Sequence, residues 1–292
     1  MVYTAINNIE KPSKEGLACT GIKANEAVHE TNMDVSHLLC SCCPIDAKQN
    51  LNDSWQILKK GASAITRTGG FMTNHITKSI QEEPCYTASL ATTMAAQIAD
   101  RGVNYRDLRN CFFNIFKKYP NLVIASMDDL FSYVEKDPAC NEMAQAMLFF
   151  KGFHAIQTQR LANRYWLDGN EAEAYWLQNR ASVLFGVDIH PAARLGSGLF
   201  VDHATGIVIG ETVEIGDNVS LFHGVTLGGT GQETGDRHPK VGSGVTVGAN
   251  ATLLGNISIG NNSIIGASTV VLKSVEPNSR VVGNPARTLT SQ

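Results

Sequence analysis

The chain has 292 residues, of which 43% are hydrophobic and 17% are charged. This composition is typical of a folded protein of about two domains and excludes a disordered one. The net charge of −3 predicts no basic surface for nucleic acid or for a membrane. No apolar run is long enough to span a membrane and no apolar signal core stands at the N-terminus, so we expect a cytoplasmic protein.

Residues 1–50 are polar, rich in turn formers and without a sustained period, and we expect an irregular arm there. The seven cysteines of the chain have irregular spacing, which predicts reduced thiols instead of a disulfide framework. A small cluster in the arm contains His37, Cys40, Cys42 and Cys43. No second ligand cluster follows at zinc spacing, so no metal is expected.

Residues 51–185 have a helical pattern, and we expect an α-helical domain over this range. Asn104 is a predicted helix start, because an aspartate follows three residues later. Ser126 is predicted to start another helix, and Pro138 to separate two helices. The segment 141–169 is apolar on several faces, which indicates a long buried helix that packs against another subunit.

After this domain the period changes to six, and we expect a β-helix over 186–275 and a tail over 276–292. Aliphatic residues recur in phase at Val183, Ile189, Leu195, Val201, Ile207, Val213, Val219 and Val225, and again at Val241, Val247, Leu253, Ile259, Ile265 and Val271. A hexapeptide period is typical of a parallel β-helix, in which each short strand turns one aliphatic side chain inward. Ordinary antiparallel strands would not give this period.

The register is interrupted once, between Val225 and Val241, which are 16 residues apart. The extra residues form a glycine-rich, charged loop over 229–240 that carries Arg237 and His238. A loop ejected from a repetitive coil is a common place for function.

Several motifs resemble those of the serine acetyltransferase family. In the repeat region these are VDIHPAARLGSGLFVDHATGIVIGETVEIGDNVSL, GVTLGGTG and GDRHPKVG, and in the helical region EKDPA and FFKGFHAIQTQRLAN. The resemblance covers roughly residues 90–288. It includes the helical domain, the coils of the β-helix and the ejected loop together. It implies an α+β fold, with an N-terminal α-helical domain followed by a C-terminal left-handed parallel β-helix.

The resemblance implies direct transfer of an acetyl group from acetyl-CoA to the hydroxyl of L-serine in a ternary complex, the first step of cysteine biosynthesis. A serine hydroxyl is a poor nucleophile at neutral pH, so a base must take its proton. The family's catalytic histidine matches His203 in VDHATG, and its partner carboxylate matches Asp188 in VDIHP. These residues are 15 positions apart, so we expect them on adjacent coils and in contact.

The family's ligands for the ammonium and carboxylate of serine match Asp137, Asp202, Arg237 and His238. Aspartates suit an ammonium, and an arginine fork suits a carboxylate. The thioester oxygen becomes negative in the transition state and needs an amide donor, for which Gly229 is the candidate. Ala249 and Ala267 match positions that line the family's pantetheine groove.

Alternatives from other classes remain open at this stage. One is a β-helical zinc hydratase that uses His190, His203, His223 and His238. Another is an idle scaffold that only binds partners. A third is an acetyltransferase that acts on a sugar or on another amino acid such as homoserine.

The resemblance also implies a homotrimer or a dimer of trimers, with each active site between neighbouring chains. L-cysteine is expected to inhibit by competing with serine. Many family members end in an isoleucine that enters the active site of O-acetylserine sulfhydrylase, whereas this chain ends in Ser291 and Gln292. Since glutamine would lose apolar burial in such a pocket, we expect no stable complex and a diffusing O-acetylserine.

Overall fold

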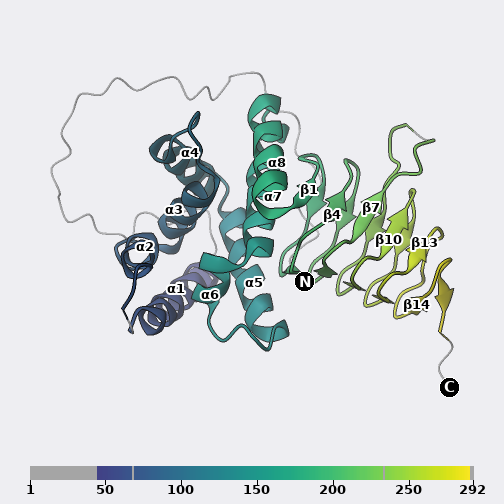
Figure 1. The fold of residues 1–292 in the computed structure, drawn as a ribbon, viewed down its shortest axis with the longest axis horizontal. Coiled ribbons are helices and arrows are strands. Elements are labelled where there is room, and N and C mark those ends of the chain that lie inside the picture. Colours follow the sequence, from purple (N-terminus) through teal and green to yellow (C-terminus); the bar gives the residue numbers. More distant parts are fainter. Residues whose placement is uncertain (1–44, 68, 233, 290–292) are drawn as a thin grey trace. The chain divides into compact units, whose positions relative to one another are not determined.

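The computed structural model describes residues 45–67, 69–232 and 234–289. Most of the arm expected over 1–50, including His37 and the three-cysteine cluster, lies outside these residues. The first helix begins at Ile45. The helices are α1 (Ile45–Thr66), α2 (Thr73–Ile76), the π-helix η2 (Thr77–Gln81), α3 (Tyr86–Ile98), α4 (Tyr105–Lys118), α5 (Pro120–Lys136), α6 (Met143–Phe149), α7 (Lys151–Leu167) and α8 (Glu171–Phe185) (Figure 1).

Of the predicted helix boundaries, two are confirmed and one is wrong. Asn104 caps α4, and its side chain accepts a hydrogen bond of 3.1 Å from the backbone amide of Asp107. Pro138 lies between α5 and α6, as predicted. Ser126 begins no helix, because α5 starts at Pro120 and buries Ser126 in its middle. There the hydroxyl donates to the Val123 carbonyl oxygen at 2.7 Å.

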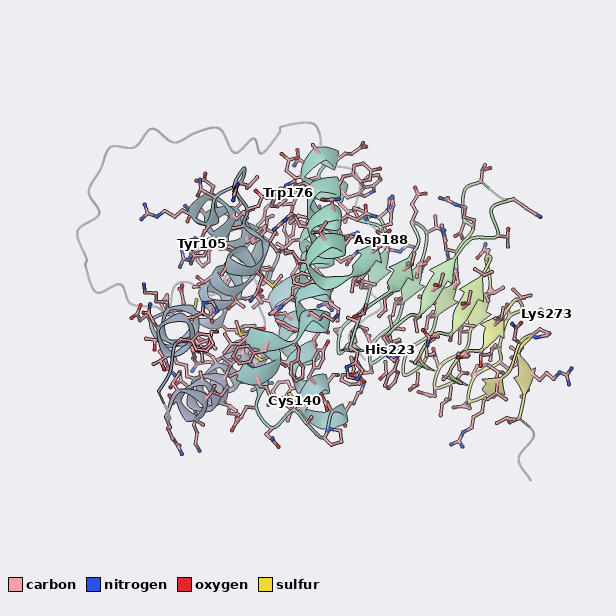
Figure 2. The ribbon with its side chains drawn as sticks, in the orientation of Figure 1. Tyr105, Cys140, Trp176, Asp188, His223 and Lys273 are labelled. Carbon is pink, nitrogen blue, oxygen red and sulfur yellow. The ribbon has the colours of Figure 1, made fainter. Side chains whose placement is uncertain are left out.

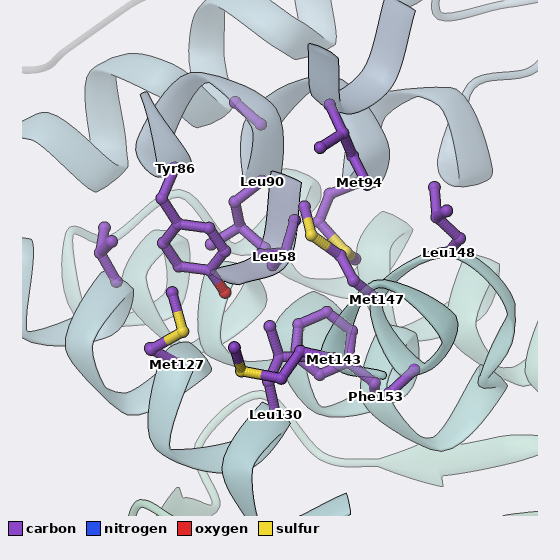
Figure 3. Packing of buried hydrophobic residues seen from close by; sticks show 14 of the residues in the cluster. Leu58, Tyr86, Leu90, Met94, Met127, Leu130, Met143, Met147, Leu148 and Phe153 are labelled. Carbon is purple, nitrogen blue, oxygen red and sulfur yellow. The ribbon is translucent and has the colours of Figure 1, made fainter. Parts of the chain in front are cut away.

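The long helix expected over 141–169 is in fact two helices, α6 and α7, since the backbone is extended at Phe150. The buried side chains of both helices pack within the chain. Met143 and Met147 of α6 lie beside Leu130 of α5 and Phe153 of α7 in one apolar cluster (Figure 3). This packing accounts for apolar residues on several faces without a second subunit.

After Phe185 the chain forms a parallel β-helix of three sheets, which confirms the predicted order of the two parts. Strands β1 (Val187–Ile189), β4 (Ile207–Ile209), β7 (Thr226–Gly228), β10 (Thr252–Leu254) and β13 (Val270–Val271) form the first sheet. Strands β2 (Arg194–Leu195), β5 (Glu214–Ile215), β8 (Lys240–Val241) and β11 (Ser258–Ile259) form the second. Strands β3 (Phe200–Asp202), β6 (Ser220–Phe222), β9 (Thr246–Val247), β12 (Ile264–Ile265), β14 (Arg280–Val282) and β15 (Arg287–Thr288) form the third.

The last two strands lie inside the range for which the sequence predicts a tail. Strand β14 pairs in parallel with β12, and β15 turns back antiparallel on β14. Ser291 and Gln292 lie outside the described residues. Across the described residues, no helix is both long and apolar enough to span a bilayer.

The aliphatic row found in the sequence changes its position in the coil after Val201. Val201 stacks on Leu221, 20 residues later, whereas Val208 stacks on Thr226, 18 residues later. The corner between β3 and β4 therefore contains two more residues than the corner of the next coil. It also contains His203. The first member of the row, Val183, lies on α8 with 68% of its surface exposed and is not part of the β-helix.

A buried polar network joins the helices to the first coil. Asp129 on α5 pairs with Arg160 on α7 and accepts a hydrogen bond of 2.8 Å from the Leu199 amide. Arg160 also donates to the Gly196 carbonyl oxygen at 2.6 Å. Because both charges are fully buried, each needs the other and the coil's backbone groups to offset the loss of water. The network therefore fixes the position of the first coil against α5 and α7.

Candidate active site

A cavity of about 560 Å³ lies where α5 and α7 meet the first coil. Its lining includes Asp137 after α5, Lys151 at the start of α7, and Asp202 and His203 at the end of β3. Three residues that the resemblance assigns to the serine site and to catalysis thus share one cavity. Asp137 is held in place by the Ala139 amide, which donates to its Oδ1 at 2.8 Å.

The Tyr133 hydroxyl fixes the wall of this cavity. It donates to the Val201 carbonyl oxygen at 2.9 Å and also lies 3.3 Å from the Val201 amide nitrogen. Burial raises the pKa of Tyr133 well above its ordinary value of 10. Gly152, the second residue of α7, lies against the same strand β3. There an added Cβ would collide with the Val201 carbonyl oxygen. Glycine is therefore required for the close approach of α7 to β3.

His203 sits on a strained corner. His203 and Ala204 both have φ of 57°, an uncommon conformation for residues with a Cβ. The corner closes with hydrogen bonds of 2.6 Å from the Ala204 amide to the Asp202 carbonyl oxygen and from the Thr205 amide to the His203 carbonyl oxygen. The result is an imidazole that is 74% exposed, with its Nε2 3.5 Å from Asp202 Oδ2. An exposed imidazole beside a carboxylate and a cavity can act as a base.

Lys151 is a further residue of the cavity that sequence reasoning missed. Its ammonium donates to the Thr205 hydroxyl, and the same hydroxyl lies 3.3 Å from the His203 carbonyl oxygen. Lys151 therefore supports the corner on which His203 stands. The segment FFKGFHA contained this lysine, but a lysine at the start of a helix carries no signal of its own.

Asp188 does not meet His203 within the chain. Both residues belong to the first coil, so the expectation of adjacent coils is wrong. Asp188 lies on β1 of the first sheet, whereas His203 follows β3 of the third. Asp188 accepts a hydrogen bond of 2.7 Å from Gln178 on α8, and in the described part of the chain no hydrogen bond or ion pair joins it to His203. Figure 2 labels Asp188 beside α8.

Two corners of the β-helix carry the remaining candidates. We call the corner from the third to the first sheet the His203 corner; it comprises residues 203–206, 223–225, 248–251 and 266–269. We call the corner from the first to the second sheet the Arg237 corner; its described residues are 190–193, 210–213, 229–232, 234–239 and 255–257. Ala249 and Ala267 lie on the His203 corner, two and three coils after His203.

Arg237, His238 and Gly229 lie together on the Arg237 corner. Arg237 Nη2 pairs with Glu211 Oε2 at 2.8 Å. His238 Nδ1 lies 2.9 Å from the Thr212 hydroxyl, and burial, reinforced by the charge of Arg237, lowers the pKa of His238. His203 precedes β4 and Thr212 follows it. The His203 corner and the Arg237 corner are therefore at opposite ends of this short strand.

The four histidines of the zinc alternative are not gathered into one site. His190 packs against the rings of Trp166 and Tyr175, with centroids 5.3 and 6.1 Å away. Burial lowers the pKa of His190. Within the described ranges, no group of three or more histidine, cysteine, aspartate or glutamate side chains is arranged to hold a metal ion.

Comparison with known proteins identifies two family models in the chain. Residues 54–158 match the N-terminal region of serine acetyltransferase, and residues 238–273 match the bacterial transferase hexapeptide of six repeats. Serine acetyltransferase 2 of Arabidopsis thaliana is 40% identical over 233 residues, which cover 80% of this chain and 72% of the relative. The serine acetyltransferase of Haemophilus influenzae is 39% identical over 235 residues, which cover 80% of this chain and 88% of the relative.

Two solved structures have the same fold. Soybean serine acetyltransferase complexed with serine is 40% identical, with a TM-score of 0.80 over 82% of this chain and 98% of that one. The serine acetyltransferase of Brucella abortus strain S19 in complex with coenzyme A is 42% identical, with a TM-score of 0.81 over 83% of this chain and 97% of that one.

Proposed function

The chain belongs to the serine acetyltransferase family and is an acyltransferase, and on this premise we propose that it transfers the acetyl group of acetyl-CoA to the hydroxyl of L-serine. The products are O-acetyl-L-serine and CoA, in the first step of cysteine biosynthesis. The observation that carries the proposal is the cavity in which Asp137, Asp202 and His203 converge. The relatives solved with serine and with coenzyme A support the choice of substrates.

In this proposal His203 takes the proton of the serine hydroxyl while the hydroxyl oxygen of serine attacks the thioester carbonyl carbon. The C–O bond forms as the C–S bond breaks, and the proton then passes from the imidazole to the departing thiolate. The carboxylates of Asp137 and Asp202 hold the substrate ammonium. Because acceptor and donor react directly, no acyl-enzyme forms.

The ligands for the serine carboxylate, Arg237 and His238, would come from a neighbouring chain. In one chain His203 precedes β4, whereas Arg237 follows β7 and pairs with Glu211, which comes after β4. The His203 corner and the Arg237 corner can therefore form one site only when β-helices pack side by side. Three parallel β-helices around an axis bring each His203 corner against the next chain's Arg237 corner. The amide of Gly229 would then reach the thioester oxygen from the same neighbour.

Mixed trimers test the shared site. H203A and R237A chains are each purified, then dissociated and reassembled together at equal ratio. At serine concentrations below the wild-type KM, activity should return to about a quarter of the wild-type value, because one interface in four pairs an intact His203 with an intact Arg237. Reassembly of each variant alone is the control, and no gain on mixing would refute the shared site.

The acetyl transfer itself is tested with His203→Ala. Turnover should fall by roughly a hundredfold or more, the scale of a lost general base, while acetyl-CoA still binds. Release of the free CoA thiol is followed with serine, homoserine and a sugar as acceptors. A folded H203A protein with near-normal turnover would sink the assignment, and a preference for another acceptor would replace serine.

We further propose that L-cysteine competes with L-serine. Cysteine offers the same ammonium to the two aspartates and the same carboxylate to Arg237 and His238, with a thiol in place of the hydroxyl. Raising serine at fixed cysteine should restore the full rate. Inhibition that persists at saturating serine would place cysteine at a separate site.

A further inference from the structure

The first turn of α7 contacts the chain on both sides of His203. Gly152 lies against the Val201 carbonyl oxygen, two residues before His203. Lys151, the residue before Gly152, donates from its ammonium to the hydroxyl of Thr205, two residues after His203. Two consecutive residues of one helix therefore flank the proposed base.

The direction of the hydrogen bonds at Thr205 follows from the groups involved. An ammonium can only donate, so the Thr205 hydroxyl must accept from Lys151. The single proton of that hydroxyl is then left for the carbonyl oxygen of His203, 3.3 Å away. The backbone amide of Thr205 donates to the same oxygen at 2.6 Å. A chain of hydrogen bonds thus runs from Lys151 through Thr205 to the backbone of His203, and the charge of the ammonium polarises the hydroxyl in the direction that strengthens it.

The backbone at His203 needs support because it is strained. His203 and Ala204 both have φ of 57°, where the Cβ is crowded by the carbonyl oxygen. Residues in this conformation persist only where their surroundings hold them. Ala204 is fully buried, so packing holds the inner side of the corner. His203 and Thr205 are exposed on the outer side, and there the hydrogen bond from Lys151 provides the hold.

We propose that Lys151 is a positioning residue: its ammonium, acting through the Thr205 hydroxyl, keeps the imidazole of His203 directed into the cavity that both residues line. This inference rests on the proposed acetyl transfer. Lys151 exchanges no proton in the reaction, and the proton of the serine hydroxyl still passes through His203 to the thiolate. Because a general base works only within hydrogen-bond reach of the proton it removes, a loosened corner lowers turnover.

Substitutions at both ends of the hydrogen bond test this role. K151M removes the ammonium and keeps most of the side chain, and T205V removes the hydroxyl and keeps the branched shape. Each should lower kcat by roughly tenfold, which is less than the loss in H203A, and should change the KM for serine less than kcat. The Kd for acetyl-CoA should stay at the wild-type value.

The double variant and a conservative variant show whether the two residues act as one unit. The K151M/T205V protein should lose no more turnover than either single variant, because the same chain of hydrogen bonds is broken in all three. T205S keeps the hydroxyl and should hold kcat within about twofold of the wild type. Should valine disturb the fold, Thr205→Ala also removes the hydroxyl and takes its place.

Lys136→Met is the matched control. Lys136 on α5 also joins a helix to a corner of the β-helix, since it donates to the Asn218 carbonyl oxygen at 3.2 Å. Asn218 has φ of 59°, so this corner has the same left-handed backbone but no proposed catalytic group. K136M should therefore keep the wild-type kcat. Urea unfolding of every variant is measured beside turnover, and K151M and T205V should be no less stable than K136M.

Full turnover in both single variants would contradict the proposal. Loss in K151M with normal turnover in T205V would overturn it in favour of direct contact between Lys151 and the substrate. Losses that multiply in the double variant would overturn it in favour of two independent roles. A loss in K136M as large as in K151M would show that any contact between helix and coil has this effect. Wild-type protein that releases no CoA with any acceptor would refute the proposed function, and this inference with it.

Discussion

Glu211 and Arg237 form an ion pair of 2.8 Å that ties the ejected loop to the preceding coil. The hydrogen bond from Arg237, together with its charge, lowers the pKa of the Glu211 carboxyl. Both side chains are partly exposed, and Arg237 Nη1 also donates to the Gly235 carbonyl oxygen at 3.0 Å. This relationship fixes an arginine fork at the corner where a substrate carboxylate is proposed to bind.

Arg237→Ala should raise the KM for serine by tenfold or more, because a charge-assisted pair with the carboxylate is lost. The affinity for acetyl-CoA, measured by isothermal titration, should change little. The matched control is Arg194→Ala, which removes an exposed arginine paired with Glu214 on the second sheet. Weaker acetyl-CoA binding in R237A would instead assign the loop to the cofactor.

Asp188→Asn should lower turnover, but by less than His203→Ala. The substitution keeps the shape of the side chain and removes the charge to which the family resemblance assigns stabilisation of the imidazolium. Steady-state kcat at saturating substrates measures the effect. Unchanged turnover would mean that Asp202, 3.5 Å from the His203 ring, is the carboxylate that assists the base.

The period of six was enough to predict the β-helix, because every coil repeats the same inward aliphatic positions. The helix boundaries were harder to predict from the sequence. Ser126 has the side chain of a helix cap, yet its hydroxyl bonds to the Val123 carbonyl oxygen inside α5. The helix in fact starts at Pro120. Proline has no amide N–H, and in the first turn of a helix that group would have no partner within the helix.

The sequence predicts candidate residues for the site, but residue spacing alone does not place them in the fold. Residue spacing does not report a corner with two extra residues, and this corner shifts the aliphatic row after Val201. Asp188 lies on β1 of the first sheet, and the chain passes through β2 and β3 before it reaches His203. Lys151 supports that corner only through the fold, because 54 positions separate it from Thr205.

Asp129→Ala should destabilise the protein by about 3–5 kcal/mol, because it leaves Arg160 as a buried charge without its partner. The loss would also free the first coil from α5, so we expect a higher KM for serine. Urea unfolding of the purified protein measures the change. Glu214→Ala removes half of an exposed ion pair and should cost less than about 1 kcal/mol. Equal costs for the two variants would contradict a structural role for the buried network.

His154 should make the protein less stable in acid. Its buried Nε2 lies 2.8 Å from the Met147 carbonyl oxygen, so Nε2 carries the proton and donates. Burial lowers the pKa of His154 from 6.5 to about 4 in the folded chain. Well above pH 6.5 the ring is uncharged in both states and contributes no pH dependence. As the pH falls below 6.5, His154 binds a proton in the unfolded chain but not in the folded chain. The free energy of unfolding therefore decreases until the pH reaches about 4.

The expected loss from this one group is on the order of 2 kcal/mol between pH 7 and pH 5. His154→Gln keeps an amide donor for Met147 and cannot titrate, so its free energy of unfolding should fall less steeply over that range. Unfolding in urea at pH 7, 6 and 5 compares the two proteins, with His75→Gln on α2 as the control for loss of a histidine. Because carboxylates titrate alike in wild type and variant, the difference between the two slopes isolates His154. Parallel slopes would show that the ring takes up its proton in the folded chain as readily as in the unfolded one.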